Sequence, residues 1–296
     1  MNLKTTLSIN LENQIVNNYK IEESKNFVGG EPLSISRLLT HLKDNAHQDY
    51  MSITTGPFNG IYPYCSKVVF LYYSDYRYSV DVGGGSLGAF LNYANISSLE
   101  FIGKSENRLY LNIKDKEVEF KEFNKDLDKK SLGLFAKRSF IDFTNKGAYV
   151  DDYFNVTDHN TFIQNNLRGI CFSTNGEFAI ESLSAYNQMR QLIIQKKNEL
   201  TIKKSNKPSC YGCPLGCKFS ANKESLKISA LPRSLVACGF ATNIYSDINT
   251  VFGCFNALDY RYNHEFLEGL SPRYFKILEE VKVLIRGVKN ETSTIL

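Results

Sequence analysis

Apolar and polar residues alternate through much of the first two hundred positions, which is the pattern of half-buried β-strands. Two alternating runs within 7–21 flank Glu12-Asn13 and predict a β-hairpin. Runs at 108–113 and 117–120 flank a charged turn and predict a second hairpin. Further strands are expected at 50–54, 67–73, 78–82, 99–102 and 167–173. The stretch 124–160 gives mixed signals and no prediction.

The spacing of apolar residues becomes helical elsewhere. Ser34 or Ser36 can cap a helix whose apolar residues follow at helical spacing, and a short helix is expected after the glycine-rich residues 83–88. The later helical patterns lie at 177–204, 233–243, 248–260 and 272–286, and Pro272 fits the first turn of the last one. The expected fold class is therefore α+β, with a β-rich domain over 1–204 and a smaller helical domain over 205–296.

Charge and hydropathy exclude several classes of protein. Thirty-five Lys and Arg against thirty-one Asp and Glu give a net charge of +4, too small and too evenly spread for nucleic-acid binding. No stretch approaches the ~20 apolar residues of a membrane-spanning helix, and the first twelve residues lack the pattern of a secretory signal. A cytoplasmic protein is expected, so its seven cysteines should stay reduced and serve packing or metal binding.

Cys210, Cys213 and Cys217 are spaced at i, i+3 and i+7. Pro214 and Gly216 bend the backbone between them, so three sulfurs can point into one small volume. Iron–sulfur clusters are held by cysteine thiolates, usually four. Zinc also accepts three cysteines and one further ligand, although structural zinc loops more often pair two two-residue spacings. An iron–sulfur cluster is the first interpretation and zinc the alternative.

Residues 206–217, which end in CYGCPLGC, resemble the cluster loop of the aldehyde:ferredoxin oxidoreductases, which reads close to NKPCYACPIGC. Those enzymes carry a tungstopterin. Five further segments resemble family motifs in the same order: 54–60 (AGPLTG), 84–89 (GGYFGA), 101–105 (VEGKA), 166–170 (NLKAI) and 241–244 (ANLGI). The resemblance covers nearly the whole chain. It implies a two-sheet β domain that carries the pterin, then a helical domain that opens with a 4Fe-4S cluster.

The chain departs from the family where the pterin would bind. The glycine-rich stretch of the family corresponds to 151–166, which contains no glycine. The acidic GPEYE segment corresponds to 230–233, and the first DxxGL pterin clamp has no counterpart in 256–262. The second clamp would lie beyond Leu296, in a half of the usual family enzyme that this sequence does not contain. A tungstopterin or molybdopterin is therefore expected to be absent, and no catalytic residue is assigned.

Four positions are candidates for a surviving cofactor or anion contact. The family arginine that serves the cofactor's phosphate region falls at Lys67, which keeps the charge but not the bidentate geometry. Gly84, Gly85 and Gly88 form a tight strand-to-helix turn. Gly83, Gly85 and Gly88, with Glu106 further on, fit a dinucleotide fingerprint on paper, but the crossover is short.

The fourth cluster cysteine of the family has no counterpart within this chain. Cys238 is the first choice for the fourth ligand, because it follows the loop closely and stands where the family has an apolar residue. A small buried hydrophobic role is its alternative. Other sources of the ligand are Cys65, Cys171, Cys254, His264, another chain or a small molecule.

The expected function is that of an iron–sulfur protein in electron transfer, or of an accessory or structural subunit of a redox complex. Its partner would be a redox protein, a catalytic subunit or a second copy of the chain. One alternative is an active tungsten- or molybdenum-pterin aldehyde oxidoreductase subunit completed by a second chain. Another is a zinc-bound or metal-free protein that binds a partner. The four histidines lie in unlike contexts, and local spacing assembles no hydrolase triad.

Overall fold

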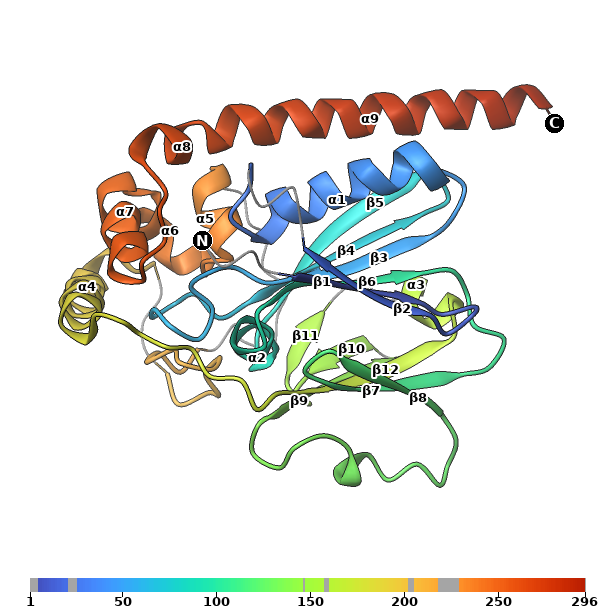
Figure 1. Ribbon diagram of the computed structural model, residues 1–296, viewed down its shortest axis with the longest axis horizontal. Helices are drawn as coiled ribbons and strands as arrows, with labels where there is room; N and C mark the ends of the chain where they lie inside the picture. The colour runs from blue at the N-terminus through green and yellow to red at the C-terminus, as the bar shows by residue number, and fades with distance from the viewer. Residues whose placement is uncertain are drawn as a thin grey trace.

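The computed structural model describes residues 5–20, 26–145, 147–156, 160–201, 205–217 and 229–295. Two six-stranded mixed sheets form the N-terminal part, and helices follow them, so the predicted α+β class is confirmed (Figure 1). No helix in these ranges has the length and apolar character needed to cross a membrane.

The first sheet has the strand order β2-β1-β6-β3-β4-β5. Its strands are β1 (Thr5–Asn10), β2 (Val16–Lys20), β3 (Tyr50–Thr54), β4 (Val68–Ser74), β5 (Arg77–Gly83) and β6 (Ile96–Ile102). β1 and β6 run parallel, and the other neighbours are antiparallel. The predicted hairpin at 7–21 and the strand at 50–54 are confirmed.

The second sheet has the order β11-β10-β9-β12-β7-β8. Its strands are β7 (Leu109–Lys114), β8 (Glu117–Glu122), β9 (Arg138–Thr144), β10 (Gly147–Val150), β11 (Phe154–Val156) and β12 (Leu167–Ser173). A 3-10 turn, η2 (Lys129–Ser131), and a short helix, α3 (Asn160–Gln164), complete this part. Strands β9 to β11 fall in the stretch 124–160, where no element was predicted.

One apolar core joins the inner faces of the two sheets. Ile53 and Phe101 of the first sheet belong to the same buried cluster as Leu111 and Phe172 of the second, all with no exposed surface. Burying a side chain of this size contributes roughly 1.5–3 kcal/mol. The short helix α2 (Leu87–Tyr93) also packs into this core through Leu87 and Leu91.

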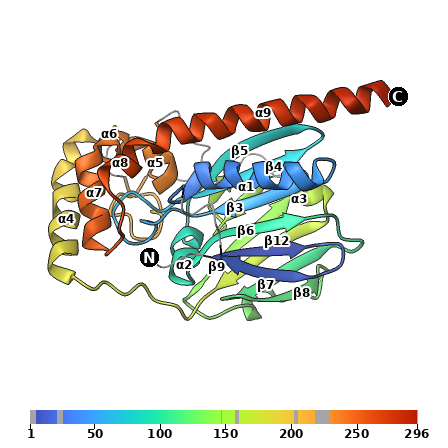
Figure 2. The same ribbon diagram turned by 45° about the horizontal axis from the view of Figure 1, so that its top comes forward.

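The helices cover the first sheet and gather at one end of it. They are α1 (Gly30–Asn45), α4 (Leu183–Gln195), η3 (Lys196–Glu199), α5 (Ala230–Leu235), η4 (Gly239–Ala241), α6 (Thr242–Ser246), α7 (Ile248–Ala257), α8 (His264–Glu268) and α9 (Leu270–Ile295). Figures 1 and 2 show α9 lying along α1, with α4 and α5 to α8 clustered beside the sheets. The buried carboxylate of Glu31 pairs with Arg233 and accepts a hydrogen bond from Tyr274, which ties α1, α5 and α9 together.

Several predicted helices differ from the observed ones at their ends. Helix α1 begins at Gly30, so neither predicted serine caps it; Ser34 is buried and its hydroxyl lies 2.7 Å from that of Thr54. The predicted helix at 177–204 begins only at Leu183, where Ser182 caps it, and 202–204 lie outside the described residues. The predicted helix at 233–243 is broken at Val236, whose left-handed backbone (φ 52) ends α5.

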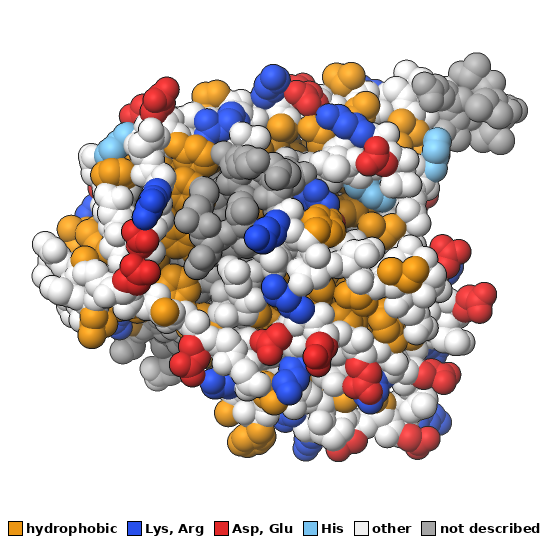
Figure 3. Space-filling model, in the orientation of Figure 1, with side chains coloured by type: hydrophobic (Ala, Val, Ile, Leu, Met, Phe, Trp, Pro, Cys, Tyr) orange, Lys and Arg blue, Asp and Glu red, His pale blue; other side chains and the backbone are white. Residues whose placement is uncertain are grey.

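Charges are mixed on the face of the molecule that Figure 3 shows. On the face seen in Figure 3, acidic and basic side chains alternate, and the described side chains there form no large area of one sign. This distribution agrees with the small net charge of +4.

Candidate metal centre

The cysteine-containing segment 205–217 lies between α2 and α4 (Figures 1 and 2). The backbone N–H of Ser205 donates to the carbonyl of Gly216 (2.6 Å), so the two ends of the segment are held together. A methyl group at Gly216 would come 2.1 Å from the carbonyl oxygen of Ser205, so only glycine permits this approach. The N–H of Cys213 donates to the carbonyl of Cys210 (3.1 Å) and closes the turn that contains two of the thiols.

The cysteine loop packs against the glycine-rich turn that follows β5. The N–H of Tyr211 donates to the carbonyl of Gly85 (3.1 Å), and the hydroxyl of Ser66 donates to the carbonyl of Tyr211 (2.6 Å). A methyl group at Gly84 would lie 2.8 Å from the sulfur of Cys210. The close packing of the loop against the sheet therefore depends on the absence of a side chain at Gly84.

A separate segment brings Cys238 to the same place. After the left-handed turn at Val236, Ala237 forms an isolated antiparallel bridge with Cys65, and the N–H of Cys238 donates to the carbonyl of Tyr64 (2.8 Å). These contacts fix the backbone of Cys238 against the loop that precedes β4. The position of Cys238 is thus determined by pairing between segments about 170 residues apart in the sequence.

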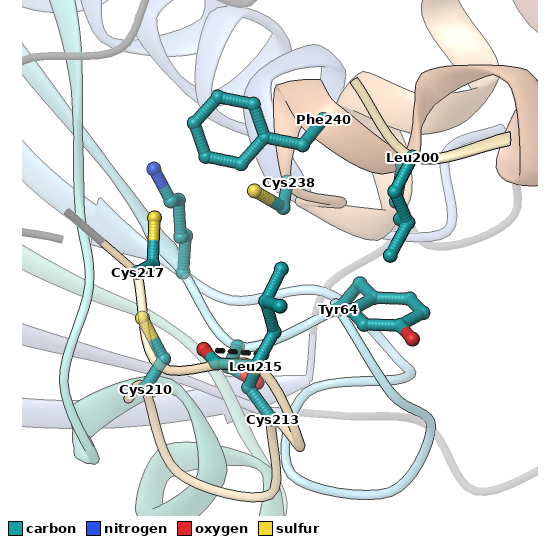
Figure 4. Close-up of a pocket in the computed structure, with 11 residues that line it drawn as sticks. Tyr64, Leu200, Cys210, Cys213, Leu215, Cys217, Cys238 and Phe240 are labelled. Carbon is teal, nitrogen blue, oxygen red and sulfur yellow. Dashed lines mark hydrogen bonds between the residues drawn. The ribbon is translucent and has the colours of Figure 1, made fainter. Parts of the chain in front are cut away.

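One cavity collects the four predicted cysteines and the predicted lysine. Its walls are formed by Tyr64, Ser66, Lys67, Leu200, Cys210, Cys213, Leu215, Cys217, Cys238, Phe240 and Ala241. In Figure 4 the sulfurs of Cys210, Cys217 and Cys238 point toward a shared space, whereas the thiol of Cys213 donates to the carbonyl of Leu215 (3.6 Å). The cavity has a volume of only about 30 Å³. A larger bound group would therefore displace some of the side chains that line it.

Burial and a lysine act in opposite directions on these thiols. Burial raises the pKa of Cys213 to about 11 and that of Cys238 to about 12, and it also raises the pKa of Cys210. The positive charge of Lys67, a side chain only 6% exposed, opposes the burial effect and lowers the pKa of Cys210 and Cys238. The thiols of Cys210, Cys213 and Cys238 are therefore protonated at neutral pH, and a metal would displace those protons on binding.

The donors that line this cavity are thiols, the ligand type that soft metals and iron–sulfur clusters prefer. Four sulfurs line it, and no Asp, Glu or His among the described residues does so. A tetrahedral zinc with Zn–S bonds of about 2.3 Å requires sulfurs within about 4 Å of one another. In the described part of the chain, no three His, Cys, Asp or Glu side chains are grouped in a way that would hold one metal ion. An iron–sulfur cluster places several irons and sulfides between the thiolates and so tolerates a wider spacing.

Three side chains pack closely against the glycine-rich turn. A methyl group at Gly84 would come 2.6 Å from the ring of Phe154, and one at Gly85 would come 2.7 Å from a carboxylate oxygen of Asp151. Gly88 faces the amide of Asn59 in the same way, at 2.3 Å. Side chains of the protein itself therefore pack against this turn, and the absence of a tungstopterin stays a prediction. A cofactor role for Lys67 and the three glycines remains a prediction.

Two residues of this arrangement were not singled out from the sequence. Residues 151–166 stood out for lacking glycine, and the acidic pair Asp151-Asp152 was expected to be solvated, yet the side chains of Asp151 and Phe154 lie against Gly85 and Gly84. The sequence signal that could have found Asp151 is an acidic pair directly after the apolar strand β10. That signal is weak, because paired acidic residues after a strand are ordinarily solvated.

The other ligand candidates do not line the cavity. Cys65 is buried at its bridge with Ala237, and Cys171 and Cys254 are buried in β12 and α7. The ring of His264 packs against Phe252, with centroids 4.2 Å apart. Among the described candidates for a fourth ligand, Cys238 alone shares a cavity with the loop cysteines.

The chain resembles known proteins both in sequence and in fold. Residues 6–137 match the family model "Aldehyde ferredoxin oxidoreductase, N-terminal domain". A solved structure described as "Active site complex BamBC of Benzoyl Coenzyme A reductase in complex with 1,5 Dienoyl-CoA" superimposes on 72% of this chain with a TM-score of 0.56 and 12% identity. The present chain spans 37% of that chain, and the likeness is one of fold. No curated protein matches significantly.

Proposed function

Residues 6–137 belong to the aldehyde ferredoxin oxidoreductase family, and from that premise we propose that this chain binds an iron–sulfur cluster through Cys210, Cys213, Cys217 and Cys238. The proposal rests on the convergence of four cysteines from two separate segments on one cavity. A lysine in the wall supports it, because a buried cation offsets part of the negative charge that thiolates and a cluster would bring.

The proposed role is one-electron transfer, in a protein that has lost the tungstopterin site of its family. The side chains of Asp151 and Phe154 above the glycine-rich turn support the loss, because they stand where an approaching cofactor would need bare backbone. When bound, a cluster supplies a reversible one-electron centre. The chain's own residues would hold it, shield it with Leu215 and Phe240, and set its charge environment with Lys67.

A partner protein is part of the proposal. The cysteine loop is reachable from outside, since Tyr211 within it is 42% exposed. The similar solved structure is described as an active site complex, and we propose by analogy that this chain also works beside another redox subunit. Electron transfer across such a contact needs a centre close to the surface, which the position of this loop would provide.

Metal analysis of anaerobically purified protein tests the assignment. We expect about four irons and about four sulfides per chain, with broad absorption near roughly 400 nm. Zinc without iron would contradict the cluster and favour a zinc-bound protein that binds a partner. Tungsten or molybdenum near one per chain would contradict the loss of the pterin and favour an enzyme subunit.

A pair of cysteine variants gives the matched control. Cys213→Ser removes a thiol from the cavity and should lower the iron content and the visible absorption. Cys254→Ser changes a buried cysteine in α7, outside that cavity, and should keep both. Iron that is unchanged in the first variant, or lost equally in the two, would refute the ligand assignment.

A further inference from the structure

A second cavity meets the cysteine loop at Tyr211. Its volume is about 560 Å³, within the range of about 300–1,000 Å³ typical of small-molecule sites. Five aromatic side chains contribute to its walls: Phe90, Tyr93, Phe178, Tyr186 and Tyr211. They come from α2, the segment after β12, α4 and the cysteine loop, so the cavity exists only in the folded chain.

Two of the aromatic side chains in the walls are held in place by hydrogen bonds from their hydroxyl groups. The hydroxyl of Tyr93 donates to the carbonyl of Gly60 (2.9 Å), and that of Tyr186 donates to the carbonyl of Ile61 (2.9 Å). The ring of Tyr211 lies 5.5 Å from that of Phe90, which is buried. Walls that are already ordered reduce the entropy lost when a ligand binds.

One polar pair lies among the residues around this cavity. The amino group of Lys137 contacts the carboxylate of Glu177 at 3.1 Å, and their side chains are 46% and 82% exposed. Ion pairs with this exposure contribute little to stability, so a ligand can compete for the amino group at small cost. Lys137 can therefore donate a hydrogen bond to an acceptor on the edge of a ligand.

We propose that this cavity binds a planar aromatic molecule of two or three fused rings that carries carbonyl acceptors along one edge. The ring system would stack against Tyr93, Tyr186 and Tyr211, and the carbonyl edge would face Lys137. Stacking on aromatic side chains is favourable for any flat π-system, and the size of the cavity suits that class of ligand. The inference goes beyond the proposed cluster and does not depend on it, because no cysteine lines this cavity.

Lumiflavin is a suitable probe, since it has three fused rings, carbonyl groups on one edge and fluorescence that stacking quenches. The chain has no Trp, so stacked tyrosine is the source of quenching to examine. We expect saturable quenching on titration of the whole protein. Tyr186→Ala should raise the Kd roughly tenfold or more, which corresponds to the loss of one stacking contact.

Two further variants distinguish the loss of the Tyr186 ring from a general effect on folding. Tyr186→Phe keeps the ring and loses only the hydrogen bond to Ile61, so its Kd should stay near that of the wild type. Phe135→Ala removes an aromatic ring that is 88% exposed and outside the cavity lining, and it should not change the Kd. Thermal unfolding of each variant confirms that it is folded.

The proposal is overturned by any of three results: no saturable quenching by the wild type, a Kd for folded Tyr186→Ala equal to the wild-type value, or an equal loss in Phe135→Ala. Because the titration can be made on protein with or without metal, its outcome is independent of the iron analysis. A failure here would leave the cluster assignment unaffected, and a colourless protein could still bind the probe.

Discussion

The carboxylate of Asp151 accepts two hydrogen bonds from Ser86, one from its backbone N–H (2.7 Å) and one from its hydroxyl (2.8 Å). Its other oxygen accepts from the hydroxyl of Ser139 (2.6 Å) and the N–H of Phe140 (3.2 Å). One side chain therefore joins the glycine-rich turn before α2 to strand β9. The carboxylate of Asp151 thus occupies the hydrogen-bond donors of Ser86 at this turn.

Replacing Asp151 should destabilise the fold. Asp151→Ala leaves four donors without their acceptor, and we expect the free energy of unfolding to fall by about 2–4 kcal/mol. Urea denaturation measures this. Asp152→Ala is the control, because Asp152 is exposed and, like Asp151, has a positive φ, so both variants share the backbone penalty. Equal losses in the two variants would show that the hydrogen bonds of Asp151 contribute nothing.

Adding a methyl group at Gly84 should disturb the cysteine loop. The new carbon would lie 2.8 Å from the sulfur of Cys210 and 2.6 Å from the ring of Phe154. Overpacking of this kind costs about 1–3 kcal/mol, and Gly84→Ala should also lower iron loading. Gly287→Ala in α9 meets nothing within 4 Å, so it should keep the iron content and raise stability by about 0.5–1 kcal/mol through helix propensity. A Gly84→Ala protein with normal iron and stability would contradict the packing argument.

Removing the charge of Lys67 should make the proposed cluster harder to reduce. Reduction adds an electron, and a nearby cation that is only 6% exposed favours that more negative state. For Lys67→Met we expect roughly a tenfold shift toward the oxidised cluster, about 59 mV for one electron. Lys67→Arg keeps the charge and should stay near the wild-type potential. An unchanged potential in Lys67→Met, measured by redox titration, would exclude an electrostatic role.

Loss of the Cys238 thiol should change the cluster without abolishing folding. Cys238→Ser leaves three thiolates in the loop, so we expect less iron per chain and an altered visible spectrum after anaerobic purification. Cys171→Ser, in the second sheet, changes a cysteine that is distant from the cavity and should match the wild type in iron content. If Cys238→Ser keeps the full iron content and spectrum, the fourth ligand has another source.

Acid should destabilise the protein through His41. Burial lowers the pKa of His41 below its ordinary value of 6.5, and its ring nitrogen lies 3.0 Å from the carbonyl of Gln48. The unfolded chain therefore binds the proton more readily, so this contribution to stability is complete above about pH 6.5 and is lost as the pH falls through the lowered value. Urea unfolding at about pH 7.5 and about pH 5.5 measures the loss.

A histidine variant isolates that contribution. His41→Gln should show a smaller fall in unfolding free energy between the two pH values than the wild type. His47→Gln, at an exposed position, should keep the wild-type pH dependence. A His41→Gln protein whose stability still falls as steeply as that of the wild type would assign the acid sensitivity to other groups.

The local alternation of apolar and polar residues predicted most of the strands. The hairpins at β1–β2 and β7–β8, and strands β3 and β12, were predicted because alternation and turn residues are properties of neighbouring positions. The start of α1 was predicted wrongly, because Ser34 forms hydrogen bonds inside the core with a strand distant in the sequence. Helix α5 ends at a left-handed Val236, which propensity alone does not indicate.

The sequence by itself determined the β-rich and helical order of the chain and the close spacing of Cys210, Cys213 and Cys217, because both depend on residues near one another along the backbone. Only the tertiary structure brought Cys238 and Lys67 to that loop and placed Asp151 against the glycine-rich turn. Those approaches depend on strand pairing and packing between remote segments, and no local pattern encodes which distant side chain will fill a given space.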